Sequence, residues 1–237
     1  KNRDQLGKFK EGFLKHILLV VPIIALLMLQ PHFSASMVII TIVAVMMILA
    51  GCKFWHFLVT GGAVGIPGMI GLIILEPYRL ARVTTFLDPW KESRGAGWQV
   101  IQSLYAIGSG GLFGAGLGES KQKYLYIPEP HNDFIFSVLA EELGFVGCVL
   151  VIVLFAIFIW RGVLIAMKSP DMFGSLIAIG ITTMVAIQVI LNIAVVTSSV
   201  PATGMPLPFF SYGGTALFIL LCEMGVLLNI SRASVKS

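Results

Sequence analysis

Long apolar runs separated by polar connections make up most of this chain. Six such runs cover residues 13–30, 37–51, 54–75, 143–160, 172–197 and 213–230. A helix needs about 20 residues to cross a hydrocarbon core of about 30 Å. The last four runs are expected to meet this requirement and the first two to be shorter; Lys15 and Pro22 in the first favour a kinked or oblique crossing. Barrel strands would show short segments of alternating polarity, so the pattern predicts an all-α, polytopic membrane bundle with six transmembrane helices.

The composition supports this class and excludes several others. Apolar residues make up 57% of the 237 residues and charged residues only 12%, about half the charged fraction of a soluble domain. A water-soluble globule and a disordered chain are therefore excluded. The net charge of +4 is small and dispersed, which excludes a nucleic-acid-binding domain. Three cysteines, Cys52, Cys148 and Cys222, cannot pair fully, so a disulfide scaffold is excluded too.

Positive charge distinguishes the two sides of the predicted bundle. Ten Lys and Arg residues fall in the N-terminal tail, the second and fourth connections and the C-terminal tail: Lys1, Arg3, Lys8, Lys10, Lys15, Lys53, Arg161, Lys168, Arg232 and Lys236. The short connections on the other side, residues 31–36 and 198–212, hold none. Because cytoplasmic connections carry the excess of Lys and Arg, both termini of this sequence are expected to be cytoplasmic.

One connection is far longer than a simple link between helices requires. Residues 76–136 contain half of the 12 acidic residues of the chain: Glu76, Asp88, Glu92, Glu119, Glu129 and Asp133. We expect this segment to be an extracytoplasmic loop within a single transmembrane domain, residues 1–237. Residues 98–107 are expected to form a short helix on the membrane surface. Function usually lies in such a polar loop on a rigid helical frame.

A glycine-rich run, residues 108–118, lies within this loop. It lacks the Gly-Lys-Ser/Thr sequence of a nucleotide-binding loop and the strand-then-helix flanks, so nucleotide binding is not expected. Two interpretations are left open. The run is either a tight loop packed at the membrane surface, or a set of backbone amides that approach an anionic lipid head group.

Asp133 is the residue in this loop that best fits a catalytic role. It follows Pro128 and Pro130 and directly precedes an apolar helix, and residues 133–142 are expected to form the start of the fourth crossing. One interpretation is a helix N-cap, since Asp accepts amide hydrogen bonds there and suits the helix dipole. The other is a general base, which must be ionised before it takes a proton. The two are compatible, because a helix N-terminus favours the ionised form.

Five further polar residues lie in predicted helices. On an ideal helix Glu141 is about 80° around and about 12 Å along from Asp133, so it could face the same cavity, whereas Glu142 lies on the opposite side. A salt bridge is the alternative for each. Glu223 lies deep in the last run, where a carboxylate is a functional candidate or a helix-packing residue. Gln188 and Asn192 share one helix face and are expected to hydrogen-bond between helices rather than line a path.

No cluster of His and Cys has metal-ligand spacing: His16 and His56 lie at predicted cytoplasmic ends, and His32 and His131 in outer loops. A dedicated metal site therefore has no support in the sequence, and no cofactor is required; a divalent cation is compatible but unsupported.

Several motifs resemble the SEDS family of membrane proteins, which includes FtsW, RodA and SpoVE. They are Gly97-Trp98-Gln99-Val100-Ile101-Gln102-Ser103, the glycine-rich run, Pro128-Glu129-Pro130-His131-Asn132-Asp133, Pro201-Ala202-Thr203-Gly204-Met205-Pro206 and Ser211-Tyr212-Gly213-Gly214. Their order matches across nearly the whole chain, and residues 225–232 look more like FtsW and SpoVE than RodA. Family members have about ten spans, so the resemblance implies that the first four are absent from this sequence and that the sequence alone is inactive.

The resemblance implies a peptidoglycan glycosyltransferase that polymerises lipid II, an undecaprenyl-pyrophosphate-linked disaccharide pentapeptide, into β-1,4 glycan strands. The loop aspartate of the family falls on Asp133. Further substrate-binding candidates are Arg79, Arg82, Lys121 and Lys123, as phosphate contacts, together with Trp98, Gln102, Glu129, His131, Glu141 and Ser211. The expected location is the bacterial plasma membrane, and the expected partners are a class B penicillin-binding protein (a transpeptidase), division or sporulation proteins and membrane lipids.

Two alternatives stay open at this point. A lipid II flippase would need cationic or strongly polar residues at membrane depth, whereas every Lys and Arg here lies at the end of a run or in a loop. A non-catalytic scaffold for a partner transpeptidase is the other, and it is compatible with enzyme activity.

Overall fold

The computed structural model describes residues 7–30, 33–75, 77–93, 95, 97–120 and 131–235. Within these ranges every regular element is a helix. In chain order they are η2 (Phe9–Leu14), α1 (Lys15–Leu29), α2 (Phe33–Leu49), α3 (Phe54–Thr60), η3 (Gly61–Gly65), α4 (Ile66–Leu75), α5 (Pro77–Leu87), η4 (Pro89–Glu92), α6 (Trp98–Ser109), α7 (Ile135–Met167), α8 (Met172–Val196) and α9 (Gly214–Val235). The predicted all-α class is confirmed.

Four helices are long and apolar enough to cross a membrane: Phe9–Leu29, Ile135–Met167, Met172–Val196 and Gly214–Ala233. The apolar helix α2 is shorter, with 17 residues. The third predicted run, residues 54–75, is one continuous helical stretch in which the π-helical segment η3 joins α3 to α4. α1 continues through Pro22, and it starts earlier than expected, on the π-helical turn η2.

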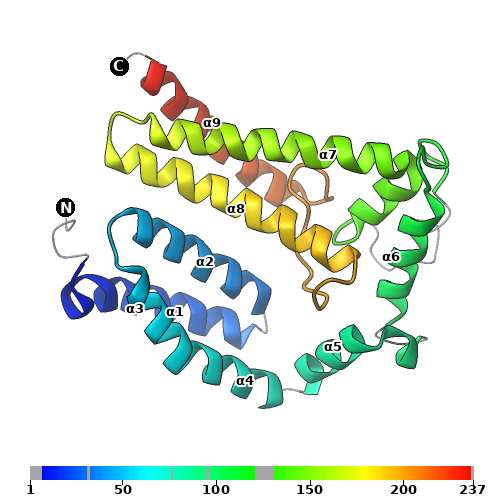
Figure 1. Ribbon diagram of the computed structural model, residues 1–237, viewed down its shortest axis with the longest axis horizontal. Coiled ribbons are helices and arrows are strands. Elements are labelled where there is room, and N and C mark those ends of the chain that lie inside the picture. The colour runs from blue at the N-terminus through cyan, green and yellow to red at the C-terminus, as the bar shows by residue number, and fades with distance from the viewer. Residues whose placement is uncertain are drawn as a thin grey trace.

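The long helices run back and forth, so that η2 and the end of α9 lie at one end of the bundle (Figure 1). The turns from α2 to α3 and from α7 to α8 lie at this end as well. α6 runs across the opposite ends of α7 and α8, as a helix on the membrane surface would. The predicted short helix at 98–107 is thus confirmed as a helix, with its end at Ser109.

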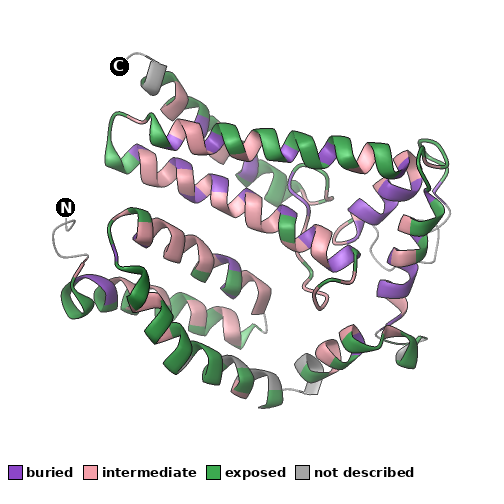
Figure 2. Ribbon diagram, viewed as in Figure 1, coloured by how far each residue is buried: buried purple, intermediate pink, exposed green. Residues whose placement is uncertain are grey.

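The core forms where α7, α8 and α9 pack together. Phe155 of α7, Val185 and Val189 of α8 and Leu220 of α9 belong to one buried cluster. A small residue permits the closest approach, since a side chain at Gly162 of α7 would overlap Thr182 of α8. Figure 2 shows further buried positions on α6 and on the first part of α7, whereas α1 has no buried residue. The outer surfaces of the long helices are apolar, as a lipid environment requires.

α7 is two helices rather than one. Gly144 has φ 67° and ψ −167°, so it separates a short helix, residues 135–143, from the crossing that begins at Phe145. Figure 1 shows the first part turned away from the axis of the second. The expected crossing at 143–160 therefore extends to Met167, and residues 133–142 are not its first turns. Glu141 and Glu142 belong to the short helix.

The glycine-rich loop supplies the hydrogen bonds that this break would otherwise lose. The Ala115 and Gly116 amides donate to the carbonyls of Glu141 and Glu142, at 2.9 and 3.1 Å. On the other side of the break, the Phe145 amide donates to the carbonyl of Gly111, at 2.9 Å. Because the Ala115 and Gly116 amides bond within the protein, they are not free to bind a lipid head group. This part of the run is instead packed against the break in α7, and its place at the membrane surface stays a prediction.

The contact between the loop and the break leaves no room for a side chain. Gly114 and Gly144 both have positive φ, 79° and 67°, which strains any other residue by about 1–2 kcal/mol. A Cβ at Gly114 would overlap the Glu142 carbonyl, and one at Gly144 would overlap the Gly114 amide. The two glycines therefore permit the close approach of two backbones.

Substitution of either glycine should destabilise the protein. We expect Gly114→Ala and Gly144→Ala to lower the free energy of unfolding by at least about 2–3 kcal/mol, since strain and a backbone clash add. Gly108→Ala is the matched control, because Gly108 lies in α6 with open space around it. Thermal unfolding in detergent measures all three. A Gly114→Ala protein as stable as Gly108→Ala would contradict the described contact.

Candidate active site

The connection between α8 and α9 folds back beside the residues that precede α7. The Tyr212 amide donates to the His131 carbonyl, at 2.8 Å. The Ser211 hydroxyl donates to the Asn132 carbonyl, at 2.6 Å, and accepts from the Leu207 amide, at 2.7 Å. Two irregular segments that are far apart in the sequence are thus joined next to Asp133.

Asn192 of α8 forms hydrogen bonds with both of these segments. Its side-chain nitrogen donates to the carbonyls of Asp133 and Met205, both at 2.8 Å. The residue is fully buried, and its Oδ1 has no hydrogen-bond partner among the described residues. One amide therefore fixes the main chain of Asp133 and of the α8–α9 connection relative to α8.

The α8–α9 connection is also tied to the helices on its outer side. The Ser34 hydroxyl of α2 donates to the Thr203 carbonyl, at 2.8 Å. Arg82 of α5 donates from Nη1 to the Ala202 carbonyl, at 2.9 Å. Residues 202–205 are consequently held from α2, α5 and α8, which makes the connection a fixed part of the frame.

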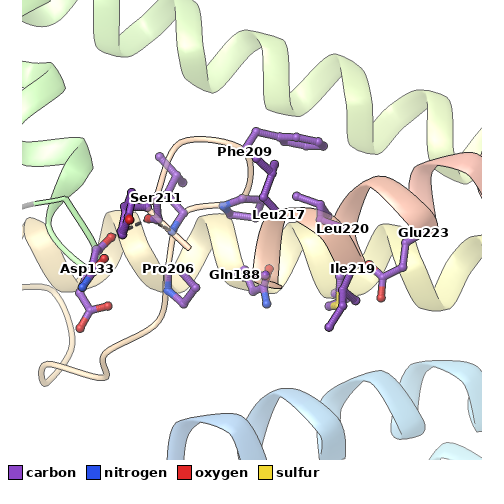
Figure 3. A pocket seen from close by; sticks show the side chains of 15 residues that line it. Asp133, Gln188, Pro206, Phe209, Ser211, Leu217, Ile219, Leu220 and Glu223 are labelled. Atoms are coloured by element: carbon purple, nitrogen blue, oxygen red, sulfur yellow. Dashed lines mark hydrogen bonds between the residues drawn. The ribbon is translucent and has the colours of Figure 1, made fainter. Parts of the chain in front are cut away.

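A cavity of about 390 Å³ lies between this connection, α8 and α9. Asp133 and Ser211 lie at one end and Glu223 at the other, with Gln188 between them (Figure 3). Apolar side chains form most of the wall, among them Met184, Leu207, Phe209, Leu217, Ile219 and Leu220. Asp133 and Glu223 are the two carboxylates that line it, and no Lys or Arg of the described chain does.

The Asp133 carboxylate lies beside the main chain of Gly204. Gly204 has φ 69°, and a Cβ there would lie 3.3 Å from Asp133 Oδ2. Asp133 is half-buried, and the N-cap of the short helix is Phe134, so the predicted N-cap role is wrong by one residue. Asp133 is instead placed at one end of the cavity by the main-chain contacts of residues 131–133.

Several predicted site residues lie away from this cavity. Glu141 is buried and accepts a hydrogen bond from the Ser120 hydroxyl, at 2.5 Å. The expectation that it could face the same cavity as Asp133 is wrong, because its carboxylate is turned toward Ser120, just after the glycine-rich run. Trp98 and the buried Gln102 lie on α6 and do not line the cavity.

The remaining candidates divide between the site and the part of the chain that is not described. Ser211 lines the cavity. The side chain of His131 is exposed, and its carbonyl accepts the hydrogen bond from the Tyr212 amide. Lys121, Lys123, Glu129 and the two prolines at 128 and 130 lie outside the described residues, as does the side chain of Arg79.

The interpretation of Gln188 and Asn192 as helix-to-helix hydrogen-bonding residues is wrong in both cases. Asn192 bonds to main-chain carbonyls outside the helices, and Gln188 lines the cavity. Glu223, a candidate because of its depth, does line the cavity, and its Oε2 has no partner among the described residues. Six residues line the cavity although the sequence did not single them out as site residues: Asn132, Pro206, Leu207, Pro208, Phe209 and Tyr212. The available signal was the proline-rich, non-helical stretch between two apolar runs.

Metal ligands do not gather in the described part of the chain. Within it, no three side chains of His, Cys, Asp or Glu lie close enough together to hold an ion.

Comparison with known proteins identifies the family. The family model described as "Cell cycle protein", which represents FtsW, RodA and SpoVE, matches residues 1–236. The chain belongs to this family. It is 46% identical over 234 residues to "Stage V sporulation protein E" of Bacillus subtilis and 43% identical over 231 residues to "Probable peptidoglycan glycosyltransferase FtsW" of Geobacter sp.. These alignments cover 99% and 98% of this chain but only 64% and 63% of the relatives, so the chain spans less than two thirds of their length.

Solved structures of the family share the fold. A chain of a peptidoglycan synthase complex, described as coordinating polymerisation and crosslinking, matches with a TM-score of 0.76 and 32% identity. The match covers 95% of this chain and 63% of that one. The crystal structure of the rod shape determining protein RodA of Thermus thermophilus matches with a TM-score of 0.62 and 29% identity, over 97% of this chain and 60% of that one. The family member described here is thus an all-helical membrane protein.

Loss of the Asn192 amide should destabilise the site more than loss of its neighbour on the same helix. Asn192→Leu removes two hydrogen bonds and leaves the Asp133 and Met205 carbonyls without them, and each such loss costs about 1–3 kcal/mol. Gln188→Leu is the control, because Gln188 makes no hydrogen bond to a described residue. We expect thermal unfolding to occur at a lower temperature for Asn192→Leu only. Equal unfolding temperatures for the two variants would contradict a stabilising role of the Asn192 hydrogen bonds.

Proposed function

We propose that this chain carries the active site of a peptidoglycan glycosyltransferase, which polymerises lipid II during synthesis of a division or sporulation septum. One observation carries the proposal: a carboxylate lies at one end of a cavity whose wall, largely apolar, follows α8 and α9. A lipid-linked sugar needs this combination, with a polar head group at the carboxylate and a lipid along the helices. The names of the relatives support the same activity.

The proposed reaction joins two sugars with inversion. The 4-hydroxyl of the acceptor GlcNAc attacks the anomeric carbon of the donor MurNAc, Asp133 accepts the hydroxyl proton, and undecaprenyl pyrophosphate leaves with the bonding electrons. The α-linkage of the donor becomes a β-1,4 bond. Inversion in one displacement requires one base, and the pyrophosphate leaving group already carries the activation. No nucleotide cofactor is needed.

The surroundings of Asp133 suit a positioned base. Its main chain is held by Asn192, and the neighbouring Asn132 carbonyl by Ser211. A group held in this way keeps its orientation toward a bound hydroxyl. Arg82 is the candidate phosphate contact that the structure describes, because its guanidinium reaches the connection that borders the cavity. Arg79, Lys121 and Lys123 stay predictions.

The cavity favours a transferase over a flippase. A flippase must stabilise a pyrophosphate at membrane depth, which calls for cations or neutral donors along its path. Between its two ends the described lining holds one neutral donor, Gln188, and no Lys or Arg, so it offers little to a pyrophosphate that would cross the membrane. A scaffold role for a class B penicillin-binding protein is compatible with the transferase, and the structural relative within a synthase complex supports such a partner.

We place this part of the protein in the bacterial plasma membrane with six crossings, and both ends of this sequence on the cytoplasmic side. η2 and the end of α9 lie at the same end of the bundle (Figure 1). Seven of the ten basic residues counted above belong to described segments at this end: Lys8, Lys10, Lys15, Lys53, Arg161, Lys168 and Arg232. Asp133 and the glycine-rich loop lie at the opposite end, where the sugars of the cell wall are assembled.

Cysteine labelling tests this orientation. A cysteine at Glu119, which is exposed on the glycine-rich loop, should react with a membrane-impermeant maleimide added to intact spheroplasts. A cysteine at the exposed Lys168, between α7 and α8, should react only after the membrane is opened. The reverse pattern would show that the proposed orientation is inverted.

Asp133→Asn should abolish most of the polymerisation by the full-length protein. The amide keeps the size of the side chain but cannot accept the proton, and general-base catalysis contributes about 10²- to 10⁴-fold. Asp171→Asn is the matched control, because Asp171 caps α8 by accepting from the Gly174 amide at 2.8 Å and Asn caps nearly as well. Gel analysis of glycan strands made from lipid II measures both. Near-normal synthesis by a folded Asp133→Asn protein would refute the base assignment.

A further inference from the structure

The glycine-rich loop ends in an exposed apolar tip, formed by Leu112, Phe113 and Leu117. The side chains of Phe113 and Leu117 are 81% and 78% exposed, although neither takes part in the proposed chemistry. Apolar side chains exposed together in this way mark a contact with another molecule or with lipid.

Main-chain hydrogen bonds fix the tip to the start of a membrane crossing. The Phe145 and Val146 amides, in the first turn after the break in α7, donate to the carbonyls of Gly111 and Leu112, at 2.9 and 3.1 Å. Gly114 and Gly144 meet backbone to backbone beside them. The position of the tip relative to the bilayer is therefore set by the position of Phe145.

Phe145 lies near one edge of the lipid that surrounds α7. The uncharged run from Phe145 to Trp160 rises about 23 Å at 1.5 Å per residue. A hydrocarbon core is about 30 Å thick, so this run covers most of it and Phe145 lies close to its outer boundary. The side chains of Phe145 and Val146 are themselves exposed, which makes the tip continuous with the outer surface of the crossing.

The segment of the chain that leads into the tip has the composition of a membrane interface. Residues 95–118 contain no charged side chain. Trp90 of η4 and Tyr105 of α6 are both exposed and form an edge-to-face pair, with ring centroids 5.9 Å apart. Trp and Tyr favour the head-group level of a bilayer. The first charge after the tip is Glu119, which gives the loop a boundary between its apolar and polar parts.

We propose that the apolar tip inserts into the adjacent lipid leaflet and anchors the glycine-rich loop at the membrane surface. The partner is the upper acyl region of the phospholipid bilayer. Because the same loop donates hydrogen bonds to the end of the short helix, the anchor sets the height of that helix, and of Asp133 before it, above the lipid. The anchor does not depend on the chemistry assigned to Asp133.

Site-directed spin labelling measures the depth of the tip directly. Single nitroxides are placed at Phe113→Cys, Leu117→Cys and, as the matched control on the same loop, Glu119→Cys. The background is Cys148→Ala with Cys222→Ser, and any cysteine of the full-length protein outside this sequence is replaced by Ser. Cys52 stays in place because burial shields it and raises the pKa of its thiol. The full-length protein is placed in nanodiscs of phosphatidylethanolamine and phosphatidylglycerol, without a partner protein, and collisions with oxygen and with a nickel complex are compared.

The proposal predicts that labels at 113 and 117 collide mainly with oxygen, as labels on the acyl chains of reference lipids do. The label at 119 should collide mainly with the nickel complex. Collisions of the 113 and 117 labels mainly with nickel would place the tip in water and overturn the proposal. Protection from both reagents would overturn it as well, because protein would then cover the tip. Should one labelled variant fail to fold, Leu112→Cys provides a further site on the tip.

Discussion

Main-chain polar groups that a helix break exposes at membrane depth cannot be satisfied by lipid, and this protein satisfies them with loops from elsewhere in the chain. At Gly144 the carbonyls of Glu141 and Glu142 and the amide of Phe145 would each lose a helical partner. Residues 111–116 replace those partners from both sides of the break. Beside the cavity, the Asn192 side chain donates hydrogen bonds to the carbonyls of Asp133 and Met205, which lie outside the helices.

These two sets of bonds locate the candidate site. The short helix, residues 135–143, is held at its end by the glycine-rich loop, and the residues before it are held by Asn192 and Ser211. Asp133 therefore occupies a fixed place between a surface loop and a membrane helix. A carboxylate there can meet the head group of a substrate whose lipid stays in the bilayer, which is the geometry that polymerisation of a lipid-linked sugar requires.

Part of this arrangement could be predicted from the sequence. The apolar run at 54–75 matches the helical stretch α3–η3–α4, and the run at 172–197 matches α8 within one residue, because burial in lipid depends on local composition alone. The sequence also indicates Asp133 and Glu223 as functional candidates, because isolated carboxylates in or beside apolar runs are unusual. Both line the cavity.

The rest depends on contacts between distant segments. Gly144 does not mark a helix break by itself, and it becomes one because the loop at 111–116 offers replacement hydrogen bonds. The comparison of Glu141 with Asp133 on one ideal helix also does not hold, because the helix begins at Ile135 and the Glu141 carboxylate bonds to Ser120. Likewise, Asn192 was expected to bond between helices, because nothing local shows that residues 197–213 return to contact Asp133.

The pH dependence of polymerisation tests the central claim, that Asp133 takes the proton, most directly. Single-turnover rates on lipid II are measured for the full-length protein and for Asp133→Asn across the acidic range. The account predicts that the unmodified enzyme slows as acid protonates its base, and that the residual rate of Asp133→Asn does not change over the same range. The same acidic decline in both proteins would contradict the account, because another group would then be the base.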